Sequence, residues 1–344
     1  MIYAPILIPT LCRAEHFIRC VESLKNNSWA KYTDVFIGLD YPPTEKYLDG
    51  YYIIKEYLSG DFSCFNSFQV IEHSQNVGSA GNMLSLRKSV EKYPYFIRTD
   101  DDAEFSPNFL EYMNKVLWHY FNDSTVLGVT GYCYPINWNV KEGSNTFRMN
   151  FLCPMWGTAF YTDRYNSVRN TLCDRYYEKK FDRLLFNKAY KKLTIARYLN
   201  FVNDGGLNED PNSLVKRTTD IGIGTFMPLD NNYCIISPIT SKVRNHGFDG
   251  SGEYCQNVSD IKKRKTTAQN YDYSHQPIDT TYSFDLFPDD STEYEINRKI
   301  LDCFDTRPYF SILKTKCKLC LYRVLGRERY FALKHLIKGM RNEQ

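Results

Sequence analysis

The first 130 residues alternate short apolar runs with segments of helical period, and this alternation limits the possible folds more than any other feature. The runs have the length and β-branched content of buried strands, while the segments between them space apolar residues three or four apart. The expected strands are residues 5–9, 34–39, 68–71, 95–98 and 126–130. Strands that alternate with helices build a parallel sheet with right-handed crossovers. We therefore predict an α/β fold whose first half is a doubly wound, Rossmann-like sheet.

Three consecutive acids, Asp100, Asp101 and Asp102, follow the fourth expected strand. Ser106-Pro107 has the character of a helix start, so the acids are expected on a turn between a strand and a helix. In open α/β sheets this carboxyl edge is where ligands bind. Clustered carboxylates repel one another unless a cation intervenes, and hard oxygen ligands suit Mg²⁺ or Mn²⁺ shared with phosphates. The alternative is a solvated acidic turn that binds nothing.

The remainder of the chain is less regular. Residues 155–161 resemble a strand, and residues 203–213 are polar and contain glycine, which indicates a loop. Residues 256–307 show no clear period. We divide the chain into residues 1–130, 131–255, 256–307 and 308–344: a ligand-binding half, a second half, an irregular extension and a helical tail.

The 11 cysteines are scattered without a paired framework. The single CxxC, Cys317 to Cys320, has no second pair or histidine cluster, so a zinc site is not expected. Free thiols indicate a reducing compartment. No run approaches the roughly 20 apolar residues of a membrane span. The first expected strand is too short for a signal peptide and lacks a basic flank, so we expect a cytoplasmic protein.

The net charge of +3 is unevenly distributed. Residues 308–344 carry nine Lys or Arg and two Glu, a net of +7, which leaves the rest of the chain at −4. The tail also has apolar residues at helical spacing, and a basic amphipathic helix suits an anionic membrane surface. The alternative is a helix packed on the rest of the chain with a solvated basic face. A nucleic-acid partner is not expected, because the acidic body would repel phosphates.

Several segments together resemble the GT-A-fold inverting glycosyltransferases. The likeness is to N-acetylglucosaminyltransferase I and to bacterial enzymes that build surface polysaccharides, and it covers roughly residues 3–255 in the family's order. The matching segments are Pro5-Ile-Leu-Ile-Pro-Thr-Leu-Cys-Arg13, Gly38-Leu-Asp40, Asp100-Asp-Asp-Ala-Glu-Phe-Ser-Pro107, Gly131-Tyr-Cys-Tyr-Pro-Ile136, Trp156-Gly157 and Asn245-His-Gly-Phe-Asp-Gly-Ser-Gly252. The resemblance implies a nucleotide-sugar-binding first half and an acceptor-binding second half.

The resemblance also implies roles at the donor site. Asp102, the last acid of the triplet, falls where the family binds its metal, Mn²⁺ or Mg²⁺. The other donor contacts are Arg13 and Asp40 at the nucleobase, Asp100 and Asp101 at the ribose or at metal-bound water, and Gly250 and Ser251 in a loop whose backbone N–H groups wrap the diphosphate. An ion pair of Arg13 with Glu15, and an ordinary turn in place of the loop, are the alternatives.

Asp220 falls where the family has its catalytic base, an acid that precedes the last strands of the second half. Aromatic residues usually surround that acid, whereas here its neighbours are Thr219 and Ile221. The alternates are three acids in the polar loop upstream: Asp204, Glu209 and Asp210.

The implied function is a metal-dependent, inverting transfer of a sugar from a nucleotide-diphosphate sugar to a hydroxyl of a glycan or lipid-linked acceptor. It would serve surface-polysaccharide synthesis at the inner face of the membrane. One rival is a sugar-nucleotide nucleotidylyltransferase, which needs a glycine-rich basic loop where this chain has Thr10-Leu11-Cys12-Arg13. The other is a catalytically inactive glycan- or nucleotide-binding protein, and the role of Asp220 distinguishes it from the enzyme.

Overall fold

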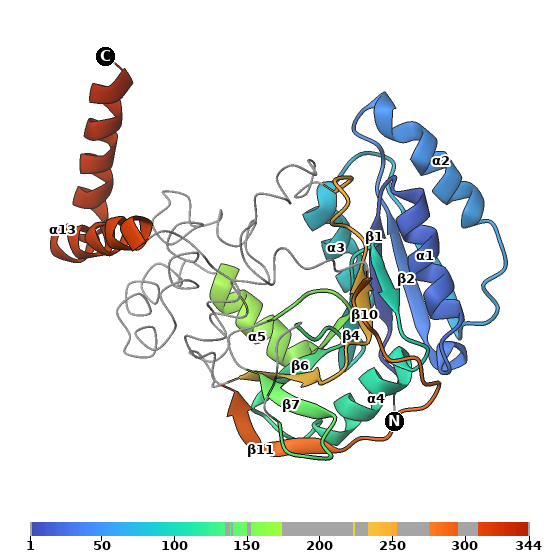
Figure 1. Ribbon diagram of the computed structural model, residues 1–344. Helices are drawn as coiled ribbons and strands as arrows, with labels where there is room; N and C mark the ends of the chain where they lie inside the picture. The colour runs from blue at the N-terminus through green and yellow to red at the C-terminus, as the bar shows by residue number, and fades with distance from the viewer. Residues whose placement is uncertain are drawn as a thin grey trace.

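The computed structural model describes residues 2–134, 138, 140–149, 153–173, 223, 233–252, 275–294 and 309–342 (Figure 1). In this part of the chain, one mixed sheet has the strand order β11-β7-β9-β6-β8-β4-β1-β2-β3, and a small sheet pairs β10 with β5. The strands are β1 (Ile6–Thr10), β2 (Asp34–Leu39), β3 (Ser67–Glu72), β4 (Tyr95–Arg98), β5 (Ala103–Phe105), β6 (Val126–Thr130), β7 (Thr146–Met149), β8 (Thr158–Tyr161), β9 (Cys234–Pro238), β10 (Val243–Asn245) and β11 (Pro288–Tyr294).

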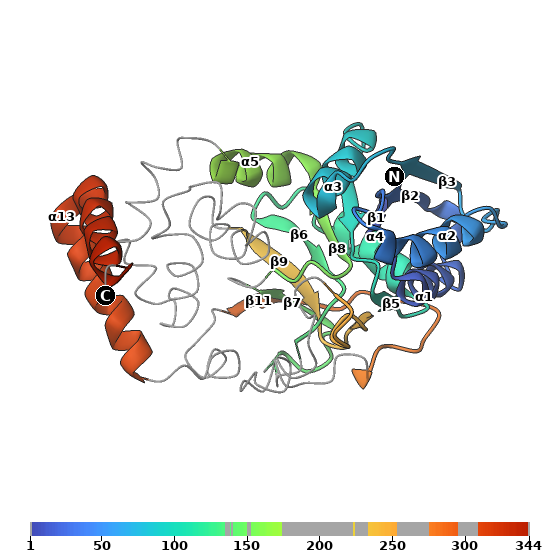
Figure 2. The ribbon, with the colours of Figure 1, turned by 90° about the horizontal axis from the view of Figure 1, so that it is seen from above.

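Helices cover both faces of the main sheet (Figure 2). They are α1 (Ala14–Lys25), α2 (Leu48–Tyr57), α3 (Gly78–Ser89), α4 (Phe109–His119) and α5 (Thr162–Cys173), with short 3₁₀ turns at Ala30–Tyr32 and Glu45–Tyr47. Buried side chains of α3 and α5 share one core with one face of the sheet, and those of α1, α2 and α4 share the other. The alternation of side chains along a strand explains the two cores: Leu7 of β1 enters the first, whereas Ile6 and Ile8 enter the second.

The predicted α/β fold class is confirmed, and the strand at residues 34–39 has the expected bounds. The sheet is not purely parallel, however. β8 lies between β4 and β6 and runs antiparallel to both, so strands from both halves of the chain interleave. β5 separates the acid triplet from α4, which begins at Phe109 rather than at residue 107. β11, which pairs with β7, lies in a stretch where no strand was predicted.

The tail forms the long helix α13 (Tyr309–Asn342), interrupted where Gly326 adopts φ 72° and ψ 172°. A positive φ of this kind is easily reached by glycine alone, so Gly326 marks the joint between the two helical parts. Apolar side chains remain on the surface of both parts, and among those whose burial is described the most exposed are Val324 and Leu336, at 81% and 62%. Among the described helices, none is long and apolar enough to cross a membrane.

Candidate active site

The acid triplet lies on the turn between β4 and β5, beyond the carboxyl end of the central strand β4. β4 pairs in parallel with β1, so the turn lies beside the segment that follows β1, which contains Thr10 and Arg13. The turn is joined to β1 by the hydrogen bond from Thr99 N to Leu7 O, at 3.2 Å. This edge of the sheet is the position at which α/β folds bind ligands.

Two of the acids, Asp101 and Asp102, are buried and share one guanidinium. Arg13 forms an ion pair with Asp101, and its Nη2 lies 2.9 Å from Asp102 Oδ2. Thr10 Oγ1 donates a second hydrogen bond to Asp101, at 2.9 Å. Burial disfavours the charged guanidinium, but the two carboxylates outweigh this and raise the pKa of Arg13. Arg13 is therefore a permanent cation held between two acids.

The third acid, Asp100, is less well compensated. Its nearest cation is Arg98, whose Nη2 lies 3.9 Å away. Its side chain keeps 39% of its surface exposed, yet the surrounding protein desolvates the carboxyl, and together with the negative charge of Asp102 this raises the pKa of Asp100 to about 7. The turn thus holds more negative charge than its arginines neutralise, which favours the approach of a cation.

The small sheet brings the loop after β10 against the triplet. β10 pairs antiparallel with β5, with Asn245 opposite Ala103. The Asn245 amide donates to Asp102 Oδ1 at 3.1 Å, and its oxygen accepts the N–H of Gly247 at 2.8 Å. A Cβ added to Gly247 would lie 2.0 Å from Asp102 Oδ2. Glycine is therefore required at 247 by the close approach of the backbone to the carboxylate.

Further contacts fix this loop in place. His246 Nε2 donates to Glu104 Oε2 at 2.6 Å, and this bond, with the nearby Arg244, holds the pKa of Glu104 below its usual range. His16 Nε2 lies 3.1 Å from Asp249 Oδ2. Phe248 packs edge-on against Trp156, with ring centroids 5.6 Å apart.

The two loop residues predicted to bind the diphosphate, Gly250 and Ser251, lie at the outer end of this loop. Gly250 has φ 97°, which glycine adopts without strain. The backbone N–H and hydroxyl of Ser251 both bind Asp249 Oδ1, at 2.9 and 2.7 Å. This Asx turn explains the local sequence and gives the loop a defined shape.

Asp40 lies beyond the carboxyl end of β2 and is 3% exposed. Its carboxylate accepts the N–H groups of Tyr41 and Val77 at 2.9 Å each, and the Asn76 amide at 3.2 Å. Its own N–H binds Thr10 O. Asp40 therefore orders the entry to α3 and connects it, through Thr10, to the acid triplet.

The oxygen donors at this site can be compared with the ligands that a metal ion requires. Among the described residues, no three His, Cys, Asp or Glu side chains converge as a metal-binding group. Mg²⁺ and Mn²⁺ in sites that handle phosphates need fewer, because one or two carboxylates suffice and substrate oxygens and water complete the shell. Asp100 and Asp102 offer such a pair, and burial, together with the negative charge of Asp102, raises the pKa of Asp100. The triplet fits a cation of this class.

Several residues at this site carried no distinct signal in the sequence. Thr10 and Asn245 lie inside the recognised segments, but their hydrogen bonds to Asp101 and Asp102 depend on chain segments more than 90 residues apart. Arg98 ended an expected strand and was not assigned a role. The predicted base, Asp220, and its alternates Asp204, Glu209 and Asp210 lie outside the described residues.

Comparison with known proteins places the chain in a family. The profile of glycosyl transferase family 2 matches residues 6–179, just over half of the chain. No curated protein matches it. Among solved structures, S. aureus TarS 1–349 shows 12% identity and a TM-score of 0.40, over 72% of this chain and 61% of that one.

Two further solved structures are similar at the same low level. A structure of S. aureus TarS shows 14% identity and a TM-score of 0.34, over 48% of this chain and 30% of that one. The mannosyltransferase PcManGT from Pyrobaculum calidifontis, solved with GDP-Man and Mn²⁺, shows 11% identity and a TM-score of 0.36, over 67% and 70%. The assignment rests on the family profile, and it agrees with a mixed sheet that holds acids at its carboxyl edge. The chain therefore belongs to glycosyl transferase family 2.

Proposed function

We propose that this glycosyltransferase is metal-dependent and inverting, and that it moves a sugar from a nucleotide-diphosphate sugar to a hydroxyl of a glycan or lipid-linked acceptor in surface-polysaccharide synthesis. The observation that carries the proposal is the acid triplet at the carboxyl end of β4, where three carboxylates face Arg13 and Arg98. Carboxylates at this edge, beside glycine backbone at Gly247, suit a diphosphate bound together with a divalent cation.

Asp102, supported by Asp100, would hold Mn²⁺ or Mg²⁺. When bound, such an ion neutralises charge that develops on a leaving diphosphate. The chain's own residues do the rest. Burial raises the pKa of Asp101, and the Arg13 guanidinium offsets part of that rise. Asn245 fixes the orientation of Asp102 through a hydrogen bond of 3.1 Å.

Asn245 and Asp249 bind the N–H groups of Gly247 and Ser251, so backbone N–H groups between these two residues would bind the diphosphate. Arg13 and Asp40 would border the nucleobase. A transfer that inverts the anomeric carbon also needs a base for the acceptor hydroxyl. The triplet lies on the diphosphate side, so we assign the base to Asp220, in the second half of the chain.

The first experiment is a screen of nucleotide-diphosphate sugars for slow hydrolysis in the presence of Mn²⁺. We expect one donor to be hydrolysed above the others, and we expect chelation to stop the reaction until Mn²⁺ or Mg²⁺ is restored. The screen reports on the donor alone, so it does not depend on knowing the acceptor. Hydrolysis that continues at full rate in excess chelator would show that the reaction does not depend on a metal ion.

We propose further that α13 docks the enzyme on anionic membrane at the cytoplasmic face. The support is the +7 charge of residues 308–344 against −4 for the rest of the chain, together with exposed apolar side chains on the same helix, among them Val324, Leu336 and Ile337. Each Lys or Arg near an anionic surface contributes about 1 kcal/mol, and this contribution is screened by salt.

Deleting residues 308–344 is expected to release the protein from anionic vesicles while activity on soluble acceptors remains. The measurement is co-sedimentation with phosphatidylserine-containing vesicles at low and high salt, with neutral vesicles as the matched control. Leu336→Glu, at an exposed apolar position, should weaken binding without removing the helix. Equal binding with and without the tail, or binding insensitive to salt, would refute membrane docking.

A further inference from the structure

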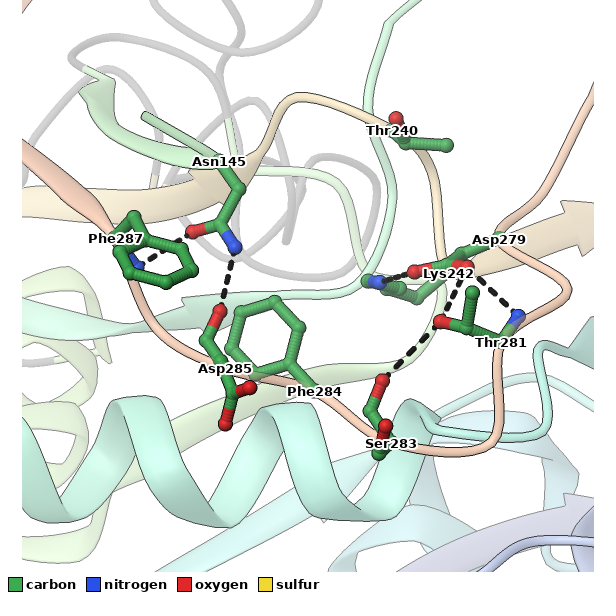
Figure 3. Close-up of a pocket in the computed structure, with 9 residues that line it drawn as sticks. All are labelled: Asn145, Thr240, Lys242, Asp279, Thr281, Ser283, Phe284, Asp285 and Phe287. Atoms are coloured by element: carbon green, nitrogen blue, oxygen red, sulfur yellow. Dashed lines mark hydrogen bonds and ion pairs between the residues drawn. The ribbon is translucent and has the colours of Figure 1, made fainter. Parts of the chain in front are cut away.

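A pocket lies in the second half of the chain, lined by residues that follow β9 and by residues 279–287 (Figure 3). Its volume is about 250 Å³, room for roughly eight water molecules. β9 runs parallel to β6, and the segment after β9, Thr240 to Lys242, forms one wall. Residues 279–287 form the opposite wall. The pocket is therefore beyond the carboxyl ends of β6 and β9, where α/β sheets bind ligands.

The inner wall of the pocket is built around a buried lysine. The side chain of Lys242 is 3% exposed and forms an ion pair with Asp279. Its ammonium also lies 4.9 Å from the ring centre of Phe284 and 5.6 Å from that of Tyr112. Asn108 donates to the same Asp279 carboxylate at 3.0 Å. These contacts leave the wall rigid and its charges paired, as in a preformed binding site.

The rim, in contrast, presents groups that are available to a ligand. Phe287 is 57% exposed, although its backbone is fixed by hydrogen bonds to Asn145 of 2.7 and 2.9 Å. Thr240 is exposed, and within the described part of the chain its hydroxyl makes no hydrogen bond. The side chain of Asp285 is 82% exposed, and its Oδ1 lies 3.5 Å from Lys115 Nζ. Around the rim, an exposed aromatic ring, a free hydroxyl and an exposed carboxylate offer both an apolar face and hydrogen-bonding partners.

The charge of the lining selects among possible ligands. Each carboxylate of the lining is paired with a lysine ammonium: Asp279 with Lys242, and Asp285 with Lys115, whose Nζ lies 3.5 Å from Asp285 Oδ1. The lining therefore offers no unpaired cation to an anion such as a phosphate. A purely apolar ligand would leave the rim's polar groups unpaired. An uncharged polyhydroxylated ligand, with C–H groups for the ring and hydroxyls for the rim, satisfies both conditions.

The pocket is connected to the acid triplet through the small sheet. Lys242 O accepts the N–H of Ser106 at 2.9 Å, and Lys242 N donates to Gly131 O at 2.7 Å. Three residues farther on, Asn245 binds Asp102. Three strand residues span about 10 Å, so a ligand in the pocket lies near the triplet without reaching it.

We propose that this pocket is a distal subsite that binds an uncharged saccharide unit of the acceptor, next to the unit that receives the new sugar. The inference rests on the proposed function, because it takes the acceptor to be a glycan. It adds that the enzyme recognises more than the reacting unit, and that Phe287 and Thr240 are specificity-determining contacts.

The test is saturation-transfer NMR on the full chain with free glucose, galactose, N-acetylglucosamine, N-acetylgalactosamine, rhamnose and ribitol, and with glycerol 3-phosphate as an anionic comparator. At least one uncharged member should bind, and glycerol 3-phosphate should not. Phe287→Ala should weaken that binding roughly 2- to 12-fold, the range of an aromatic contact. Thr240→Val, which keeps shape and removes the hydroxyl, should weaken it by a similar factor.

Tyr282→Ala is the matched control, since Tyr282 is a 68% exposed aromatic on the same segment that does not line the pocket. It should bind saccharide as the wild type does, and thermal melts should show all three variants folded. Binding unchanged in both Phe287→Ala and Thr240→Val, binding by no uncharged member, or preference for glycerol 3-phosphate would each overturn the subsite. Donor hydrolysis by the wild type is scored separately, so failure of the proposed transfer is distinguishable from failure of the subsite.

Discussion

Asp102→Asn is expected to lose metal-dependent donor binding while the protein stays folded. The amide keeps the size of the carboxylate, and its oxygen can still accept the hydrogen bond from Asn245 that Asp102 accepts at 3.1 Å. Arg13 remains anchored by Asp101, so the turn keeps its main ion pair. What disappears is the negative charge that a divalent cation requires. Loss of even an indirect support of a metal ligand costs about 10- to 100-fold in affinity, and loss of the ligand should cost at least as much.

The measurement is titration calorimetry of the nucleotide diphosphate with and without Mn²⁺, accompanied by a thermal melt. Asp61→Asn, a change at an exposed loop acid that binds only Ser63, is the matched control and should behave as the wild type does. If Asp102→Asn still binds the nucleotide in a Mn²⁺-dependent way, Asp102 is not the metal ligand and the cation is bound by other residues.

Asp220→Asn is expected to lower kcat by about 10² to 10⁴, the usual contribution of a positioned general base, with donor affinity nearly unchanged. An inverting transfer places its base on the far side of the anomeric carbon from the leaving diphosphate. In the proposed function the triplet faces the leaving diphosphate, and Arg13, Thr10 and Asn245 already bind two of its carboxylates, Asp101 and Asp102. On that proposal, we expect the base to come from the second half of the chain.

The measurement is single-turnover kinetics with saturating donor, which separates chemistry from binding. Asp204→Asn and Asp210→Asn serve as matched controls, because they change nearby acids in the same way. Near-normal kcat in Asp220→Asn together with a slow alternate variant would reassign the base. A product that retains the anomeric configuration would discard the single-base scheme altogether.

Local pattern was sufficient to predict most elements of the first 130 residues, because each strand and helix there has its own period. β2 begins and ends where expected. The position of β8 between β4 and β6 could not be predicted in this way, since strand order depends on long-range pairing and not on the apolar pattern of one strand. β11 was missed because Pro288-Asp-Asp-Ser-Thr-Glu-Tyr294 is almost entirely polar and pairs only at the sheet's edge.

The residues of the candidate site also fall into two groups: those that the local sequence pattern identifies and those that only long-range contacts bring to the site. Asp102 and its neighbours were identifiable because three adjacent acids after an apolar strand are visible in the sequence. The partners of these acids were not. Arg13 was assigned to the nucleobase, and the structure also joins it to Asp101 and Asp102. Asn245 reaches Asp102 across 143 residues of chain, a contact set by the pairing of β10 with β5.

The antiparallel strand β8 has a consequence for how the molecule assembles. β4 and β6 are both made before it, and each is left with an unpaired edge until Thr158–Tyr161 is synthesised and inserts between them. The fit is close, since a Cβ at Gly128 would lie 2.0 Å from Ala159 O. Contacts between strands so far apart in sequence slow folding, and open edges invite pairing with other chains. A nascent chain that ends after β6 is therefore a species that chaperones would need to protect, and the sheet closes only when its second half arrives.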